Sequence, residues 1–304
     1  MQIPAPTEDE APAEAGEWSL ERLRGELDRL DESLHGLLME RAEVVARLTR
    51  LRLKPGVALR PGREAEIIRR RLGRHRGPLP AATIVRIWRE LLVGTTGMQA
   101  PFSVAVCTPE RDGGETGAAF VALAREHFGA LTPARLHRSP AQAIAEILIG
   151  TASVAVLPFP AEGDPAGRWW QRLGTHDMPR AHVVARLPFW APRPEGMPHL
   201  SALVLSTAPP DPSGRDTSLF SLAFAPELSR TRLTASITAA GFALGPVLIE
   251  RDETAGLARA LVEVAGFVTE DDPRLARLDR LAEPPCLIGA YAIPEPEPEQ
   301  ASQP

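Results

Sequence analysis

A row of leucines with one arginine in it is the first feature of the sequence that could support chemistry. The leucines repeat every seven residues: Leu20, Leu27, Leu34 and Leu48. The same row places Arg41 where a fifth apolar residue would be expected. A guanidinium in an apolar row needs a partner, because an unpaired buried charge is very costly. The partner is either a carboxylate of the protein, such as Glu40, or an anionic ligand, and the sequence leaves both interpretations open.

Two further arginines belong to the same predicted helix. Arg52 follows Arg41 by eleven residues, which leaves about 20° of rotation, so both share one face and could hold carboxylates in bidentate fashion. Arg24 lies about 25 Å from Arg41 along the helix axis. Arg24 can therefore reach the same small ligand only from a second, antiparallel copy of the chain. If Arg24 is functional, the protein is a dimer whose sites combine residues of both chains.

Three polar residues stand out on the next two predicted helices. Thr95 and Gln99 are four residues apart and so share a face. Glu64 lies in the first turn of its helix. A glutamate there is also expected simply because a carboxylate interacts favourably with the helix dipole. Its position alone therefore does not distinguish a functional residue from one that only stabilises the helix.

The elements that position these residues are three predicted helices. They cover residues 18–52, 61–76 and 81–99, with breaks at Pro55-Gly56 and at residues 77–80. The first helix would be about 50 Å long, which is too long for one wall of a compact monomer.

Beyond Pro101 the sequence changes character. Short apolar runs alternate with helical patterns, which predicts an α/β domain over residues 101–207. Residues 208–216 have the composition of a linker, and residues 216–294 read as a small α+β domain. Proline-, alanine- and glutamate-rich segments at 1–17 and 295–304 are predicted to be disordered tails.

Composition excludes several classes of protein. The 304 residues are 44% hydrophobic with a net charge of −5, which excludes global disorder and gives no indication of nucleic-acid binding. Residues 18–100 carry +7, between an acidic tail and an acidic body. Cys107 and Cys286 form no CxxC pair, so we expect a reducing, cytoplasmic environment. No apolar run is long enough to span a membrane, and no histidine has metal-ligand spacing. The basic run at 69–76 is interpreted as a helix exterior.

Three segments of residues 18–100 together resemble one family. The segments are LERLRGELDRLDESLHGLLMERAEVVARLTRLR (20–52), PGREAEIIRRRL (61–72) and IWRELLVGTTGMQ (87–99). They resemble the all-helical class of chorismate mutase, which implies a three-helix domain in an intertwined homodimer. The resemblance implies that chorismate is bound by Arg24 of the partner subunit, Arg41, Arg63 and Thr95. It implies that the catalytic residues are Arg52 and Gln99 at the ether oxygen and Glu64 at the ring hydroxyl. No cofactor and no metal are implied.

Two positions depart from that family pattern. The family usually has lysine where this chain has Arg52, and it often has aspartate where this chain has Arg60. Both changes put a guanidinium, which is planar and delocalised, in place of a different group.

The rest of the chain weakly resembles the remainder of a bifunctional chorismate mutase–prephenate dehydratase. Residues 101–207 resemble the dehydratase domain, a periplasmic-binding-like α/β fold, and residues 216–294 resemble its regulatory ACT domain. The Thr-Arg-Phe motif of the dehydratase is replaced by HLSALVL at His199–Leu205, and its Glu-Asn-Ser stretch by FPAEG at 159–163. We therefore expect no dehydratase activity. In the ACT region, a signature element is reduced to Glu250-Arg251.

The sequence predicts a multidomain protein, α followed by α/β, that acts as a cytoplasmic chorismate mutase. The activity would be the pericyclic conversion of chorismate to prephenate in phenylalanine and tyrosine biosynthesis, by a homodimer without nucleic-acid or membrane partners. Two alternatives remain open. One is a non-catalytic regulatory or metabolite-binding protein, and the other is a bifunctional mutase–dehydratase.

Overall fold

The chain divides into two compact units, residues 1–55 and 56–304. The computed structural model describes residues 19–51, 58–109, 114–174, 180–191, 193, 195–197, 199–252 and 256–296. The predicted N-terminal tail and the candidate residue Arg52 lie outside these ranges.

The first unit contains the long helix α2 (Leu20–Arg50), which confirms the first predicted helix. Its start is defined by Ser19, whose hydroxyl oxygen accepts the backbone N–H of Arg22 at 3.1 Å. Arg47 and Arg50 lie in the last turn, where positive charge is favourable beside the carbonyl end of the helix dipole.

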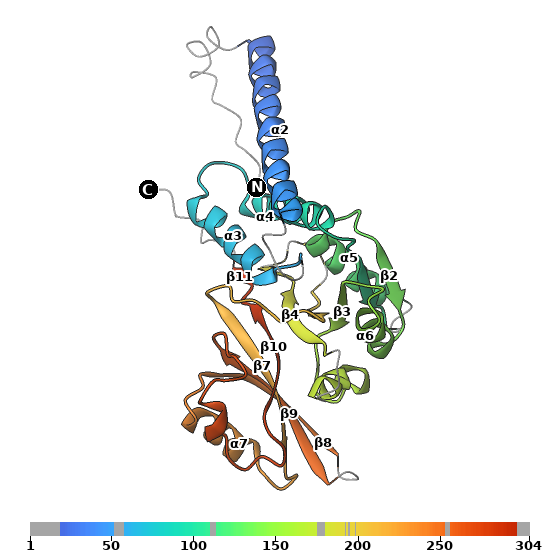
Figure 1. The fold of residues 1–304 in the computed structure, drawn as a ribbon, viewed down its shortest axis with the longest axis vertical. Helices are drawn as coiled ribbons and strands as arrows, with labels where there is room; N and C mark the ends of the chain where they lie inside the picture. The colour runs from blue at the N-terminus through green and yellow to red at the C-terminus, as the bar shows by residue number, and fades with distance from the viewer. Residues whose placement is uncertain are drawn as a thin grey trace. The chain divides into compact units, whose positions relative to one another are not determined.

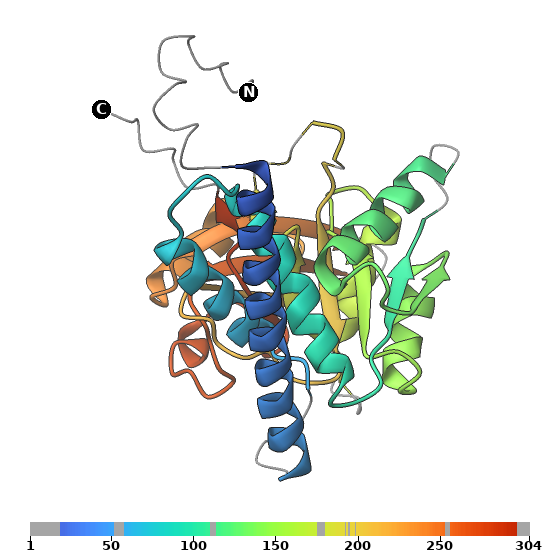
Figure 2. The same ribbon diagram turned by 90° about the horizontal axis from the view of Figure 1, so that it is seen from above.

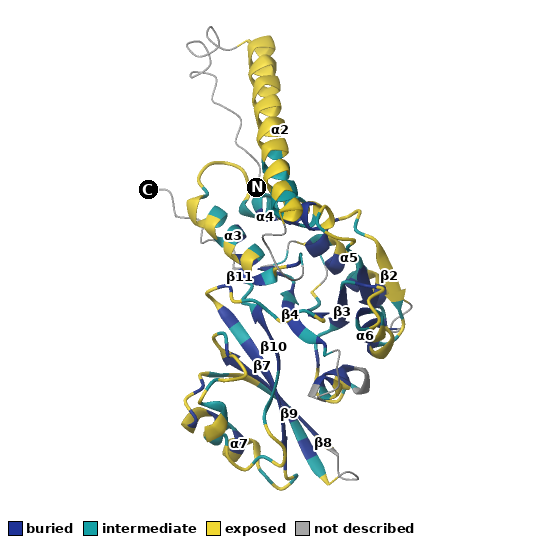
Figure 3. Ribbon diagram, viewed as in Figure 1, coloured by how far each residue is buried: buried dark blue, intermediate teal, exposed yellow. Residues whose placement is uncertain are grey.

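No side chain of α2 is buried within the single chain, and the helix is exposed along most of its length (Figure 3). The exposed residues include members of the seven-residue row: Leu20, Leu27 and Leu34 are 64%, 60% and 56% exposed. Leucines repeated at this period are typical of a helix that packs against another helix.

The second unit begins with the two other predicted helices, α3 (Pro61–Arg74) and α4 (Ala81–Gly97) (Figure 1). Pro61 occupies the first turn of α3, where a missing N–H removes no hydrogen bond. The two helices pack through Ile68 and Val85 against Phe189 and Trp190 of the α/β region.

A nine-stranded mixed sheet follows, with the order β2-β1-β3-β6-β4-β10-β7-β9-β8. Its strands are β1 (Val104–Cys107), β2 (Ala134–His137), β3 (Val154–Pro158), β4 (His182–Leu187), β6 (Ala202–Ser206), β7 (Asp216–Phe224), β8 (Leu244–Asp252), β9 (Leu257–Ala265) and β10 (Cys286–Ala292). Most of these strands were predicted as apolar runs. β2 was not, because its residues are mostly exposed and leave no apolar run.

Helices α5 (Glu115–Phe128) and α6 (Pro140–Leu148) cover opposite faces of the first half of this sheet (Figure 2). Alternating residues of β1 make this possible, because Val106 packs with α5 and Cys107 packs with α6. The 3-10 helix η2 (Pro165–Gly174) adds Trp170 to the core on the α6 face. This half has the α/β character that the sequence predicted.

The second half of the sheet is antiparallel and carries α7 (Arg230–Ala239) on one face. Phe220, Leu233 and Phe242 are among the residues of its core. The short 3-10 helix η3 (Leu275–Arg277) also belongs to this half. The arrangement confirms the predicted fold class, α followed by α/β.

The C-terminal end differs from the expectation of a disordered tail that starts at residue 295. Glu295–Pro296 form strand β11, which pairs with β5 (Trp190–Ala191). The reason is electrostatic, because the Glu295 carboxylate is bound by the guanidinium groups of Arg69 and Arg215.

Gly289 joins the two halves of the sheet, because it pairs with Val183 across β10 and β4. Its φ is +143°, and an added Cβ would lie 2.1 Å from the carbonyl oxygen of Val183. We predict that Gly289→Ala lowers the free energy of unfolding by about 3 kcal/mol or more, because steric overlap adds to an unfavourable backbone conformation. Urea titration measures this change.

The matched control is Gly73→Ala in α3, where nothing lies within 4 Å of an added Cβ. That substitution should be neutral or stabilise by up to about 1 kcal/mol, because alanine favours helix. Equal effects of the two substitutions would contradict the close approach at Gly289.

Candidate active site

Glu64 is held inside the second unit by an ion pair. Nη1 of Arg89, on α4, donates to the Glu64 carboxylate at 3.0 Å, and both side chains are largely buried. Burial raises the pKa of Glu64, while the positive charge of Arg89 opposes that rise. Burial lowers the pKa of Arg89 to about 10, so the guanidinium keeps its charge at neutral pH. Glu64 is therefore more than a favourable charge at a helix N-terminus.

Arg63 points to different partners than its neighbour Glu64. Its guanidinium pairs with Glu66, and its backbone N–H donates to the carboxylate of Asp211 at 3.1 Å. Asp211 also accepts the N–H of Gly62 and the side chain of Arg60, at 3.0 and 3.1 Å. Asp211, from the linker, thus supplies a carboxylate at the start of α3 where the family pattern often has an aspartate at residue 60.

Thr95 and Gln99 lie together near the end of α4. The Gln99 side-chain amide donates to the carbonyl oxygen of Thr95 at 3.0 Å. The Thr95 hydroxyl donates to the carbonyl oxygens of Leu91 and Leu92, both at 3.0 Å. These hydrogen bonds to backbone carbonyl oxygens of α4 orient both side chains.

The remaining candidates belong to the first unit or lie outside the described residues. Arg24 is exposed on α2, whereas Arg41 is partly buried on the same helix. Arg52 lies outside the described ranges. The roles of all seven candidate residues stay predictions.

Arg89 is the residue of this region that the sequence reasoning missed. The helix was predicted, but its buried stripe was not identified: Val85, Arg89 and Leu92 are all buried and follow i, i+4, i+7 spacing. A charged residue at an interior position of such a stripe is the signal that could have found it, as it did for Arg41.

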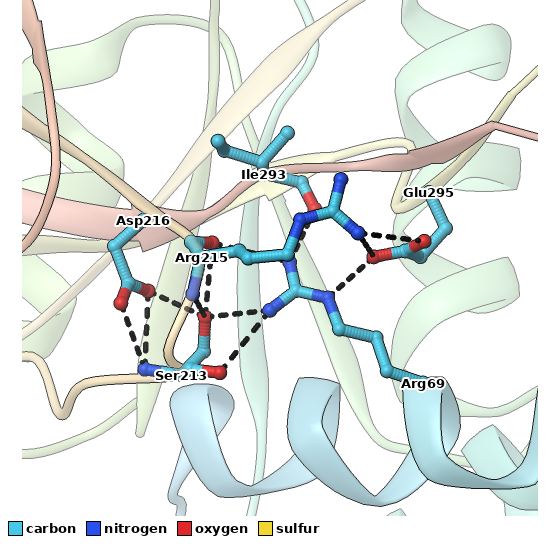
Figure 4. Close-up of polar contacts among 6 residues, drawn as sticks. All are labelled: Arg69, Ser213, Arg215, Asp216, Ile293 and Glu295. Carbon is cyan, nitrogen blue, oxygen red and sulfur yellow. Dashed lines mark hydrogen bonds and ion pairs between the residues drawn. The ribbon is translucent and has the colours of Figure 1, made fainter. Parts of the chain in front are cut away.

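Arg69 corrects the interpretation of the basic run as a plain helix exterior. Its guanidinium makes five hydrogen bonds, as many as it has N–H groups (Figure 4). The acceptors are the Glu295 carboxylate, the hydroxyl and carbonyl oxygens of Ser213, and the carbonyl oxygens of Arg215 and Ile293. The contacts fasten α3 to both ends of the 216–294 segment.

Glu250, which remains from the ACT signature, and the segment that replaces the Thr-Arg-Phe motif both have structural roles. Glu250 accepts the N–H of Gly163 at 3.2 Å and pairs with Arg168 at 2.9 Å. Ala202–Ser206, which contains most of the segment that replaces the Thr-Arg-Phe motif, is a fully buried strand. Within the described ranges, no three His, Cys, Asp or Glu side chains are grouped as metal ligands, and no helix is long and apolar enough to span a membrane.

His127, at the end of α5, is a buried titratable group near Arg89. Burial, reinforced by the charge of Arg89, holds the pKa of His127 well below its usual value of 6.5. The folded protein therefore keeps His127 neutral under conditions in which the unfolded chain protonates it.

We predict that His127 makes the protein acid-sensitive. The unfolded state binds the extra proton, so stability is retained above pH 6.5 and falls below it, by at most about 1.4 kcal/mol per pH unit. Urea unfolding at pH 7.5, 6.5 and 5.5 measures the slope. His127→Gln should remove this part of it, and an unchanged slope in the variant would disprove the assignment.

Comparison with known proteins identifies the N-terminal region. Residues 23–100 match the sequence model of the family "Chorismate mutase type II". The bifunctional chorismate mutase/prephenate dehydratase of Pseudomonas aeruginosa is 30% identical over 150 residues, which is 47% of this chain and 40% of that protein. The corresponding enzyme of Stutzerimonas stutzeri is 27% identical over 145 residues, 46% of this chain and 38% of that protein. These matches confirm the resemblance predicted for the N-terminal helices.

The chain spans about two fifths of the length of these curated relatives. Among solved structures, prephenate dehydratase from Arthrobacter aurescens in complex with L-Phe covers 62% of this chain and 90% of its own, with 12% identity and a TM-score of 0.45. Similarity at this level does not establish a shared activity.

Proposed function

We propose that this chain, which carries a chorismate mutase type II domain at residues 23–100, catalyses the conversion of chorismate to prephenate. The family match is the observation that carries the proposal, because the matched stretch contains all seven candidate residues. The reaction is a pericyclic rearrangement that needs neither a nucleophile nor proton transfer. An enzyme accelerates it by holding the reactive conformer and stabilising charge on the breaking ether oxygen.

In this proposal the guanidinium groups of Arg24 and Arg41 bind the two carboxylates of the substrate. Arg52 and the Gln99 amide donate hydrogen bonds to the ether oxygen, Glu64 binds the ring hydroxyl, and Thr95 and Arg63 are further contacts. Two observations support the assignment. The Gln99 side chain is oriented by its hydrogen bond to Thr95, and Glu64 is fixed by Arg89.

We further propose that the active protein is a homodimer formed through α2. The support is the absence of any buried side chain on α2 within one chain. Covering its leucine row would contribute about 25 cal/mol for each Å² of apolar surface. An antiparallel second copy also brings its Arg24 towards Arg41 of the first, which a single straight helix cannot do. A cytoplasmic location stays a prediction.

The first experiment measures loss of chorismate absorbance on addition of the full-length protein. Turnover is expected, and Arg41→Ala should reduce kcat/KM by about 100-fold or more, because removing one partner of a buried, hydrogen-bonded charge pair costs about 2–5 kcal/mol. Arg29→Ala is the matched control, since Arg29 is an exposed arginine of α2 paired with Glu26. Chorismate binding without turnover would favour the non-catalytic alternative.

A mixing experiment tests the two-chain site. Arg24→Ala and Arg41→Ala proteins should each be nearly inactive, but after unfolding and refolding together half the dimers are mixed, and each mixed dimer regains one intact site. About a quarter of the wild-type activity should therefore return. If no activity returns although mixed dimers are present, Arg24 of one chain and Arg41 of the other do not meet in one site.

We propose that the chain has no prephenate dehydratase activity, although the relatives it matches are bifunctional. The support is the loss of the Thr-Arg-Phe motif, which is replaced by HLSALVL at His199–Leu205. Incubation with prephenate at neutral pH should produce no phenylpyruvate above the uncatalysed rate. Enzyme-dependent phenylpyruvate would establish the bifunctional alternative instead.

A further inference from the structure

A cavity of about 570 Å³ lies in the second unit beside α4. Its walls come from the first half of α4, the end of α5 and the chain at and around β5. This volume is in the range of sites for small organic ligands. None of the described candidate residues of the mutase site lines it, so the cavity is separate from that site.

Apolar and aromatic side chains form much of the wall. Val85, Phe189 and Trp190 line the cavity, and each is otherwise buried in the core between α4 and the α/β region. Ala82 and Met197 extend the apolar surface. A ligand with an aromatic ring would find flat hydrophobic neighbours there.

The buried charges at the cavity are already neutralised within the protein. Arg89 pairs with Glu64 at 3.0 Å, and Arg193 makes a bidentate pair with Glu126 at 2.6 Å for both bonds. A charged ligand would therefore lose its hydration without gaining a buried counter-charge, which is unfavourable. The remaining charged residues of the wall are exposed and of opposite sign: Arg86 and Glu195.

The polar groups that stay available in the cavity are uncharged. His127 lines it and is only 8% exposed, yet its ring nitrogens make no hydrogen bond within the described residues. Unlike the Nε atoms of Arg89 and Arg193, these nitrogens are not sealed inside the protein. The hydroxyl of Thr83, also in the wall, likewise makes no hydrogen bond within the described residues.

The electrostatic surroundings decide which hydrogen bonds His127 can make. Burial and the nearby charge of Arg89 hold the pKa of His127 well below its usual value of 6.5. The imidazole is therefore neutral at neutral pH, with one donor nitrogen and one acceptor nitrogen. A ligand hydroxyl could donate to the acceptor nitrogen, whereas a carboxylate could not.

We propose that this cavity binds an uncharged aromatic molecule that carries a hydroxyl group. The ring packs against Phe189 and Trp190, and the hydroxyl donates a hydrogen bond to the unprotonated ring nitrogen of His127. The proposal is independent of the mutase activity, because binding can be measured without turnover.

The test is calorimetric titration of the full-length protein at neutral pH with 4-ethylphenol, which is uncharged there because a phenol ionises near about pH 10. Saturable binding is expected. The methyl ether 4-ethylanisole, which lacks the donor, should bind several-fold more weakly, as expected for one hydrogen bond between neutral groups. The anion 4-ethylbenzoate should bind at least about tenfold more weakly. Absence of saturable binding of 4-ethylphenol, or equal affinity for either comparison compound, would overturn the proposal.

Two variants locate the ligand and its hydroxyl. His127→Phe keeps an aromatic ring but removes both nitrogens, so it should weaken binding of 4-ethylphenol several-fold and leave that of 4-ethylanisole unchanged. A merely structural effect would weaken both alike. Ala82→Leu fills the cavity from α4 and should weaken both at least about tenfold, whereas the control Ala118→Leu, at an exposed position of α5, should change neither.

Thermal unfolding checks that each variant is folded. Wild-type affinity for 4-ethylphenol in folded His127→Phe and Ala82→Leu proteins would place the ligand outside the cavity and overturn the proposal. The comparison of the three compounds on the unsubstituted protein keeps the test decisive if a variant does not fold.

Discussion

A helix of 31 residues on which no side chain is buried by its own chain is the constraint that shapes the proposed function. The leucine row of α2 is stable in water only if another surface covers it, because exposed apolar area carries a free-energy cost that grows with its size. A second copy satisfies this need and places arginines of two chains within reach of one dianionic ligand. Self-association and substrate recognition would then be consequences of the same helix.

In the second unit, arginine side chains bind carboxylates of the protein, as arginines are proposed to bind the carboxylates of the substrate. Arg69, Arg89 and Arg193 are each largely buried and each face one carboxylate, of Glu295, Glu64 and Glu126 respectively. The planar guanidinium suits such sites because it can make several directed hydrogen bonds while keeping its charge. The chain has a single lysine, Lys54. Arginine is therefore the cation that anchors helices, joins segments and, by our proposal, binds the carboxylates of the substrate.

Local signals allowed much of the fold to be predicted. Pro61 marks a helix start that the structure confirms, and apolar runs located most strands. The contacts that hold the candidate site in place were not predictable in this way. Arg89 meets Glu64 across 25 residues and Arg69 meets Glu295 across 226. Such pairs depend on which helices and strands become neighbours, and that information is not contained in any short window of sequence.

The Asp211 contact has a consequence for the independence of the mutase segment. Free N–H groups at the start of α3 are satisfied by a carboxylate from a linker that lies beyond the whole α/β region. Gly62 leaves no space for a side chain beside that linker, since an added Cβ would lie 2.1 Å from the carbonyl oxygen of Asp211. The stretch from residue 18 to residue 100 therefore does not contain all the groups that complete its own helices. The second of them takes its N-terminal carboxylate from Asp211, 149 residues after Gly62 in the sequence.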